Sequence, residues 1–255
     1  MLLFCVVGPA LSDGSSNLLL QGIDSLYQAY NDWDEKMFEQ SLTEFEMAAQ
    51  IRQKDGLAEY WSGTAYFFLS LHNLFSTGNA PDEARGTKNA KKGIEILTLS
   101  IERNPDFSEP YALRGVLRGI LINMKPVSVF KQGPKVGKDR KKALALDANN
   151  PRVHYLTGVS FWFAPEILGG SDKALEHLKI AEALFEKEGK RKINALRPSW
   201  GQSSCLAFIA DIYISQKQDQ NAYAYYKKAL EANPNDPLAL KGIKKLDYIK
   251  DGMKE

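Results

Sequence analysis

The chain has 255 residues, of which 44% are hydrophobic and 25% charged, and its formal net charge is +2 at pH 7. This composition is typical of a soluble globular protein, and the small net charge excludes a global field that attracts nucleic acid or membranes. The two cysteines, Cys5 and Cys205, are too few for a disulfide framework.

Residues 1–15 combine a short apolar run, Leu2–Val7, with the small residues around Ala10. That order resembles the end of a secretory signal peptide, although no basic residue precedes the run. We therefore expect a truncated signal segment and an exported, periplasmic protein. The alternative is a disordered N-terminus on a cytoplasmic chain. No later segment is apolar and long enough to predict a transmembrane helix, so the mature chain is expected to have no integral membrane segment.

Residues 16–250 predict a series of helix pairs separated by polar, Gly- or Pro-containing breaks. Within the second pair, Trp61, Ala65 and Phe68 alternate large and small side chains, which lets two helix axes approach closely. The pairs are expected at residues 16–32 and 34–53, about 61–103, about 108–147, 151–184 and 203–234.

The third pair contains two arginines at positions that are normally apolar in such repeats. Arg114 and Arg118 lie one helical turn apart, and charged groups on an inward face need a partner. We expect an internal ion pair with a carboxylate such as Glu109 or Glu102. The alternative is an anion-binding position in the groove of the array.

An insertion is expected at residues 124–138, between the two helices of the third pair. This segment and the residues after it are basic, and Asp139 is their only acidic neighbour. The basic residues are Lys125, Lys131, Lys135, Lys138, Arg140, Lys141 and Lys142. They form either a solvated loop and helix start, or a charged surface for an acidic partner or a phospholipid membrane. Nucleic acid is not expected, because Phe130 is the only aromatic residue there for base stacking.

The most regular spacing lies in the C-terminal part, between Ser203 and Pro234 and in the helix that follows. Leu240 stands where Leu206 stood, 240 − 206 = 34 residues earlier. A helix pair that repeats every 34 residues is the signature of the tetratricopeptide repeat (TPR). We therefore predict an all-α fold, a TPR-like right-handed α-solenoid of about five helix pairs with a C-terminal capping helix. Residues 151–250 hold its best-defined repeats.

Three segments of the chain resemble a group of exported bacterial TPR-like proteins. They are NNPRVHYLTG at residues 149–158, APEILGGSDKAL at 164–175 and PSWG at 198–201. The group includes the TPR-containing T-component associated with TRAP-type solute transporters. The resemblance implies an accessory role in solute uptake.

In a TPR array, the first helices of successive pairs line a concave groove. By their register, the residues expected to bind a partner in this groove are Tyr66, Leu69, Arg152, Tyr155 and Trp162. Tyrosine and tryptophan give large, rigid contacts with a polar tip, which is typical of binding hot spots. The alternative is that these aromatic residues only cover neighbouring helices.

No catalytic or metal-binding motif is present in the sequence. The segment Gly133–Asp139 lacks the spacing and the hydroxyl residue of a phosphate-binding loop. His72, His154 and His177 are scattered, and His154 takes a large packing position that indicates a core role. We therefore expect no enzyme activity, no cofactor and no metal.

Two functions remain open. The first is a non-enzymatic scaffold that binds a protein or peptide partner in the concave groove. The second is an exported accessory component of solute uptake, like the TRAP-transporter T-component, that binds a small anionic or amphipathic ligand. The resemblance and the two arginines, Arg114 and Arg118, favour this second function.

Overall fold

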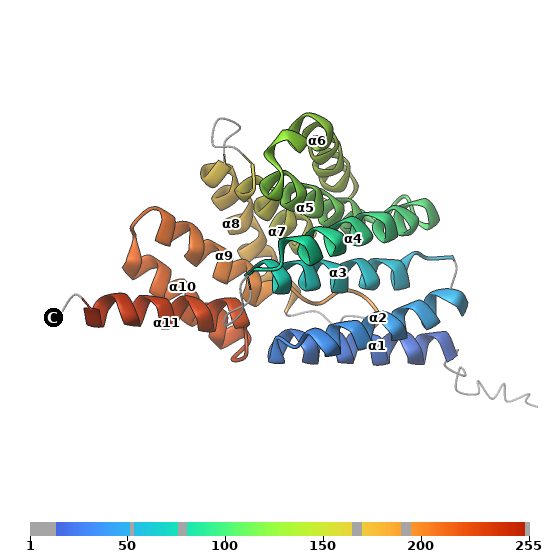
Figure 1. Ribbon diagram of the computed structural model, residues 1–255, viewed down its shortest axis with the longest axis horizontal. Coiled ribbons are helices and arrows are strands. Elements are labelled where there is room, and N and C mark those ends of the chain that lie inside the picture. The colour runs from blue at the N-terminus through green and yellow to red at the C-terminus, as the bar shows by residue number, and fades with distance from the viewer. Residues whose placement is uncertain (1–13, 52–53, 76–80, 165–169, 190–194, 253–255) are drawn as a thin grey trace, which may run out of the picture.

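The computed structural model describes residues 14–51, 54–75, 81–164, 170–189 and 195–252, and these ranges contain α-helices and no strand (Figure 1). The helices are α1 (Gly14–Asp32), α2 (Glu35–Ile51), α3 (Leu57–Phe75), α4 (Glu83–Arg103), α5 (Ser108–Met124), α6 (Val129–Leu146), α7 (Pro151–Trp162), α8 (Gly170–Glu188), α9 (Gln202–Ser215), α10 (Asp219–Ala232) and α11 (Pro237–Gly252), with a 3-10 turn, η1, at Pro126–Ser128.

Consecutive helices pack as five pairs, from α1–α2 to α9–α10, and α11 packs on α9 and α10 as a cap. The predicted all-α solenoid of five pairs and a capping helix is thereby confirmed. The 34-residue step from Leu206 to Leu240 joins α9 to α11, but Leu206 is 6% exposed and Leu240 is 48% exposed. No described helix follows α11 to cover the outer position.

Local sequence signals set the start of α7. The side chain of Asn150 accepts hydrogen bonds from the backbone N–H groups of Arg152 and Val153, and Pro151 takes the first helical position. Proline is tolerated there because its missing N–H group would have no partner within the helix. The Asn-Pro pair therefore ends one repeat and begins the next.

Small residues allow the two helices of a pair to approach. At Gly158 of α7, an added Cβ would lie 2.7 Å from Leu178 Cγ and 2.9 Å from the backbone oxygen of Ala174, both on α8. The backbone oxygen cannot move aside as a flexible side chain does. The large–small spacing of the sequence thus corresponds to a direct contact between α7 and α8.

Replacing Gly158 with alanine is expected to lower the free energy of unfolding by about 1–3 kcal/mol, because α7 and α8 must separate. Urea denaturation followed by circular dichroism measures this loss. Gly137→Ala in α6 is the matched control, since an added Cβ there meets nothing within 4 Å. The control should be neutral or more stable, since alanine favours a helix over glycine. Equal stability of the two variants would contradict the close contact.

The expected insertion at residues 124–138 is not a separate insertion. Its first part forms η1, and α6 begins at Val129 and continues through Pro134, so α5 and α6 are an ordinary pair. The glycines and the proline of this segment are typical of a loop, but Val136 is buried, as are Asp139 and Ala143 further along α6. Tertiary packing on α5 thus overrides the local propensity.

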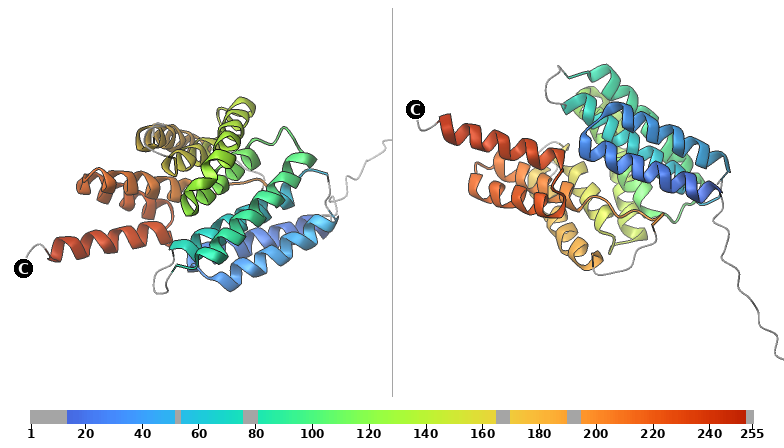
Figure 2. Two further views of the ribbon diagram at one scale, coloured as in Figure 1. Left: turned by 45° about the horizontal axis from the view of Figure 1, so that its top comes forward. Right: turned by 90° about the horizontal axis from the view of Figure 1, so that it is seen from below.

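The array turns far enough to bring its last helix back to its first (Figure 2). The hydroxyl of Tyr30 on α1 donates to Asp236 Oδ2 at 2.7 Å and lies 2.7 Å from Ser204 Oγ of α9. Asn233 Nδ2 donates to Asn31 Oδ1 at 3.0 Å beside them. These contacts tie α1 to α9 and to the turn before α11, so the two ends of the solenoid are joined.

Two sequence-based expectations fall wholly or partly outside the described residues. They are residues 1–13 of the expected signal segment, whose last two residues, Gly14 and Ser15, begin α1, and residues 165–169 of the resembling segment at 164–175. Among the helices that the structure does describe, none combines the length and apolarity needed to cross a bilayer.

Candidate functional site

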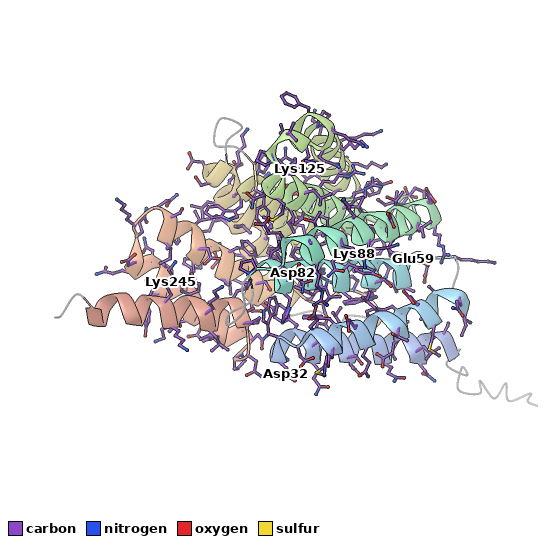
Figure 3. All side chains as sticks on the ribbon, viewed as in Figure 1. Asp32, Glu59, Asp82, Lys88, Lys125 and Lys245 are labelled. Carbon is purple, nitrogen blue, oxygen red and sulfur yellow. The ribbon has the colours of Figure 1, made fainter. Side chains whose placement is uncertain are left out.

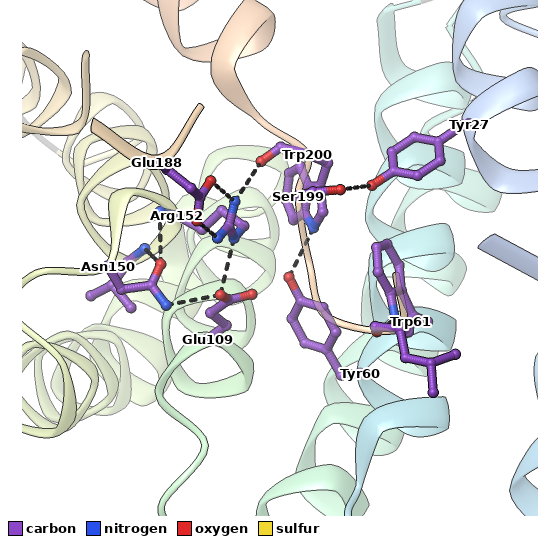
Figure 4. A network of polar contacts seen from close by, with 11 residues as sticks. Tyr27, Tyr60, Trp61, Glu109, Asn150, Arg152, Glu188, Ser199 and Trp200 are labelled. Atoms are coloured by element: carbon purple, nitrogen blue, oxygen red, sulfur yellow. Dashed lines mark hydrogen bonds and ion pairs between the residues drawn. The ribbon is translucent and has the colours of Figure 1, made fainter. Parts of the chain in front are cut away.

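The concave side of the array is occupied along one part by the chain itself. Residues 195–201, called the inner segment below, lie between the first helices of the pairs (Figure 4). Trp61 Nε1 donates to the backbone oxygen of Leu196 at 3.0 Å, and Trp200 Nε1 donates to the Tyr60 hydroxyl at 2.9 Å. Trp200 is 6% exposed. Part of the surface that a TPR array normally offers to a partner is therefore filled here by an internal segment.

Arg152 holds the inner segment to the third and fourth helix pairs (Figure 4). Its guanidinium donates to Glu109 Oε1 at 3.0 Å, to Glu188 Oε2 at 2.8 Å and to the backbone oxygen of Trp200 at 3.3 Å. Asn150 Nδ2 also donates to Glu109 Oε1, at 2.8 Å. The two carboxylates raise the pKa of Arg152, although burial alone would lower it. The prediction that Arg152 faces a groove is wrong: it is 3% exposed and serves as an internal ion-pair centre.

Arg114 and Arg118 converge on Asp139 of α6. Arg114 donates to Asp139 Oδ1 at 2.7 Å and to Thr98 at 3.0 Å, and Arg118 donates to Asp139 Oδ2 at 2.9 Å. The internal ion pair expected from the sequence is present, but its carboxylate is Asp139, because Glu109 pairs with Arg152. The two arginines share this one buried carboxylate, so the internal role is present and the anion-binding alternative stays a prediction.

The other expected groove residues are divided by the structure. Leu69 is 2% exposed and Tyr155 is fully buried, so both are core residues and their assignment to a groove surface is corrected. Tyr66 is partly exposed but lies beside α4, where its Cβ is 3.1 Å from the Cβ position of Gly93, away from the concave side. Trp162 is partly exposed and lines a concave pocket.

This pocket, called the concave pocket below, has a volume of about 530 Å³. Its aromatic lining is Trp33, Trp162, Phe163, Phe208 and Tyr226, its aliphatic lining is Leu71, Ile214, Leu238 and Leu246, and its polar lining is Asn123, Asp211, Lys241 and Lys245. The backbone of Trp33 is left-handed, with φ of 51°, in the turn between α1 and α2. The lining thus comes from the first helices of the pairs, from Tyr226 of α10 and from the cap, and the inner segment is not part of it.

The charged groups of the pocket are unequal in number. Lys241 and Lys245 of α11 are exposed, and Asp211 of α9 is the one carboxylate in the lining. Burial raises the pKa of Asp211 from 3.8 to about 6, while the hydrogen bond from the Tyr226 hydroxyl and the two lysines oppose the rise. With Asp211 ionised, the lining carries one negative and two positive charges, so it favours an anionic group.

Asp211 is expected to make stability depend on pH. The raised pKa means that the unfolded chain loses this proton near pH 3.8 and the folded chain near pH 6, so stability falls as pH rises through that window. Asp211→Asn should therefore increase the free energy of unfolding by about 1 kcal/mol at pH 7.5. A fully buried carboxylate would give a larger increase, but Asp211 is partly exposed and solvent screens its charge. Urea unfolding at pH 3.5 and pH 7.5 checks this, and an equal effect at both values would contradict it.

Two histidines that are distant in the sequence lie together. His154 Nδ1 and His177 Nδ1 are 3.1 Å apart, and His154 Nε2 is 3.0 Å from the backbone oxygen of Ala148. His154 is 7% exposed, which confirms its predicted core role, and burial lowers the pKa of both rings. No group of three or more metal-ligating side chains occurs in the described ranges.

The sequence analysis missed the concave pocket as a unit. It named Trp162, but the other four aromatic residues come from α9, α10 and the ends of α1 and α7, and Lys241 and Lys245 come from the predicted capping helix. Only the return of α11 towards α1 brings these groups together. The signal that was available is the repeat register, which places Asp211 on the inner side of α9.

Comparisons with known proteins agree with this architecture. Residues 203–236 match the family model described as tetratricopeptide repeat. TTC0263, a thermophilic TPR protein of Thermus thermophilus, is similar in structure at 21% identity and a TM-score of 0.62, over 90% of this chain and 97% of that one. The HusA haemophore of Porphyromonas gingivalis is similar at 16% identity and a TM-score of 0.63, over 81% of this chain and 96% of that one.

No curated protein matches the chain by sequence. Neither structural neighbour is described as a part of a TRAP transporter, and at these identities the likeness shows the fold alone. The resemblance to the T-component therefore stays a prediction. The chain therefore contains a match to the tetratricopeptide-repeat model at residues 203–236 and shares its helical fold with the TPR protein TTC0263.

Proposed function

We propose that the protein is a non-enzymatic TPR scaffold whose concave pocket binds an amphipathic ligand with an apolar, planar or aliphatic body and an anionic end. The observation that carries the proposal is the grouping of five aromatic side chains with two lysines around one cavity. A volume of about 530 Å³ lies within the range of small-molecule sites. The aromatic walls suit the apolar body, and Lys241 and Lys245 suit the anionic end.

A small ligand, or one residue of a partner, fits the concave side better than a long extended peptide. A peptide in extended conformation needs a continuous channel along several first helices. The inner segment occupies part of that path through Trp61, Tyr60 and Arg152. HusA, which has a similar fold, is described as a haemophore, so this helical scaffold is compatible with carrying a small molecule.

The test uses 1-naphthaleneacetate and its neutral amide, 1-naphthaleneacetamide, as probes of equal shape in calorimetric titrations. The proposal expects the acid to bind more tightly than the amide. Lys245→Gln should weaken binding of the acid by about five- to tenfold and leave the amide unchanged, because one charge-assisted contact is lost. Trp162→Ala should weaken both probes, since both use the aromatic wall.

Lys244→Gln is the matched control, because Lys244 is also on α11 and exposed but does not line the concave pocket. It removes the same charge from the same helix and should bind both probes as the unmodified protein does. No binding of either probe at about 1 mM, or an equal loss in the Lys244→Gln and Lys245→Gln variants, would contradict the proposal.

A further inference from the structure

The outer face of α6 is basic and has no acidic residue on it. Lys131, Lys135, Lys138 and Lys142 are exposed and recur every three or four residues, so they share one side of the helix. Lys125 and Lys141 extend this side and are exposed as well. None of these lysines takes part in an ion pair within the described structure. The lysines and Phe130 together are called the α6 face below.

The one carboxylate of this region does not neutralise the α6 face. Asp139 lies on the side of α6 that packs on α5, where it is 2% exposed and pairs with Arg114 and Arg118. Arg140 is also turned away from the face, because its guanidinium lies 3.7 Å from the ring centre of Phe161 on α7. The six lysines therefore present their full charge to solvent, although the whole chain has a net charge of only +2.

The basic surface continues onto α4. Lys88 and Lys91 are exposed there and line a shallow cleft with Lys125, while Glu83 and Glu95 are the acidic residues at this cleft. Lys92 pairs with Glu95 at 3.2 Å. Figure 3 shows Lys88 and Lys125 on this side of the molecule, whereas Lys245 of the concave pocket lies on α11. The basic surface and the concave pocket are thus separate.

Two apolar side chains project at the start of the α6 face. Phe130 is 84% exposed and Val127 is 65% exposed, and they are the most exposed large hydrophobic residues described. Exposed apolar side chains beside a lysine cluster are complementary to an anionic membrane surface. The lysines complement the anionic headgroups, and the apolar side chains complement the apolar layer beneath them. Nucleic acid fits less well, because Phe130 is the only aromatic side chain on the α6 face for base stacking.

We propose that the α6 face docks on an anionic phospholipid surface, with the lysines on the headgroups and Phe130 and Val127 inserted between them. The experiment is flotation of the full chain with vesicles of phosphatidylglycerol and phosphatidylcholine, compared with vesicles of phosphatidylcholine alone. The chain should float only with the anionic vesicles, and less at high salt, because salt screens exposed charges.

Three variants locate the contact. Lys131→Gln, Lys135→Gln and Lys138→Gln together should weaken binding at least tenfold, since each lysine near such a surface contributes about five-fold. The matched control is Lys36→Gln, Lys187→Gln and Lys227→Gln, which removes three exposed lysines from α2, α8 and α10. It changes the net charge equally and should keep its binding. Phe130→Ser should weaken binding about threefold or more at unchanged charge.

Three results would overturn the proposal: no flotation with anionic vesicles, unchanged flotation of the α6 triple variant, or equal loss in the two triple variants. Binding of single-stranded DNA with the same lysine dependence, and no binding of vesicles, would overturn it in favour of nucleic acid. All substituted side chains are exposed, so circular dichroism should confirm that each variant folds normally.

Discussion

Arg152→Met is expected to lower the free energy of unfolding by about 3–5 kcal/mol, because it leaves the buried carboxylate of Glu109 without its counter-charge. Glu109 is 3% exposed, and Arg152 is its ion-pair partner in the described structure. The same substitution releases Glu188 and the backbone oxygen of Trp200. Three separate parts of the chain, α5, α8 and the inner segment, therefore lose one common partner.

Urea denaturation at pH 7 measures this loss, and a double variant tests its cause. Adding Glu109→Gln to Arg152→Met removes the stranded negative charge, so the double variant should regain at least about 1 kcal/mol. A loss below about 1 kcal/mol in Arg152→Met would mean that Arg152 is not the centre of the network. No recovery in the double variant would show that packing, and not charge, dominates at this position.

Trp200→Ala is expected to lower the free energy of unfolding by about 3–5 kcal/mol, since it leaves a cavity on the concave side. The indole packs edge-on against Phe68 and Tyr155, with ring centres 5.5 and 6.0 Å away, and its N–H donates to Tyr60. Because Trp200 belongs to the inner segment, the substitution removes the main anchor of residues 195–201 in the array.

Trp200→Phe separates packing from hydrogen bonding at the same position. It keeps most of the ring volume and loses the donor to Tyr60, so we expect a loss of about 1 kcal/mol. Thermal unfolding of the two variants gives the comparison. If Trp200→Ala is as stable as Trp200→Phe, the inner segment is not anchored by this side chain.

The sequence was sufficient to predict the five helix pairs and the cap, because each pair repeats the same large and small positions over a short distance. Gly158 against Leu178 is such a local contact. The sequence was not sufficient at residues 124–138. Gly133, Pro134 and Gly137 favour a loop there, but Val136 is buried and the segment forms a helix that packs on α5.

The prediction that Tyr155 and Arg152 form an exposed groove surface was wrong for a different reason. Register alone assigns Tyr155 and Arg152 to the inner side of α7, and the structure agrees that they are on that side. The inner segment then covers them, and its path depends on contacts such as the bond between Trp200 and Tyr60, 140 residues apart. No local pattern predicts a contact of that range, and the same holds for the closure of α11 on α1.

A cavity-filling variant tests most directly whether the concave pocket is a binding cavity. Asn123 is an exposed residue of the lining, so Asn123→Trp should fill the pocket without disturbing the core, with Asn123→Ala as its control. In a calorimetric titration with 1-naphthaleneacetate, Asn123→Ala should bind like the unmodified protein and Asn123→Trp at least about tenfold more weakly. A folded Asn123→Trp variant that binds the probe as tightly as Asn123→Ala would contradict binding in the concave pocket.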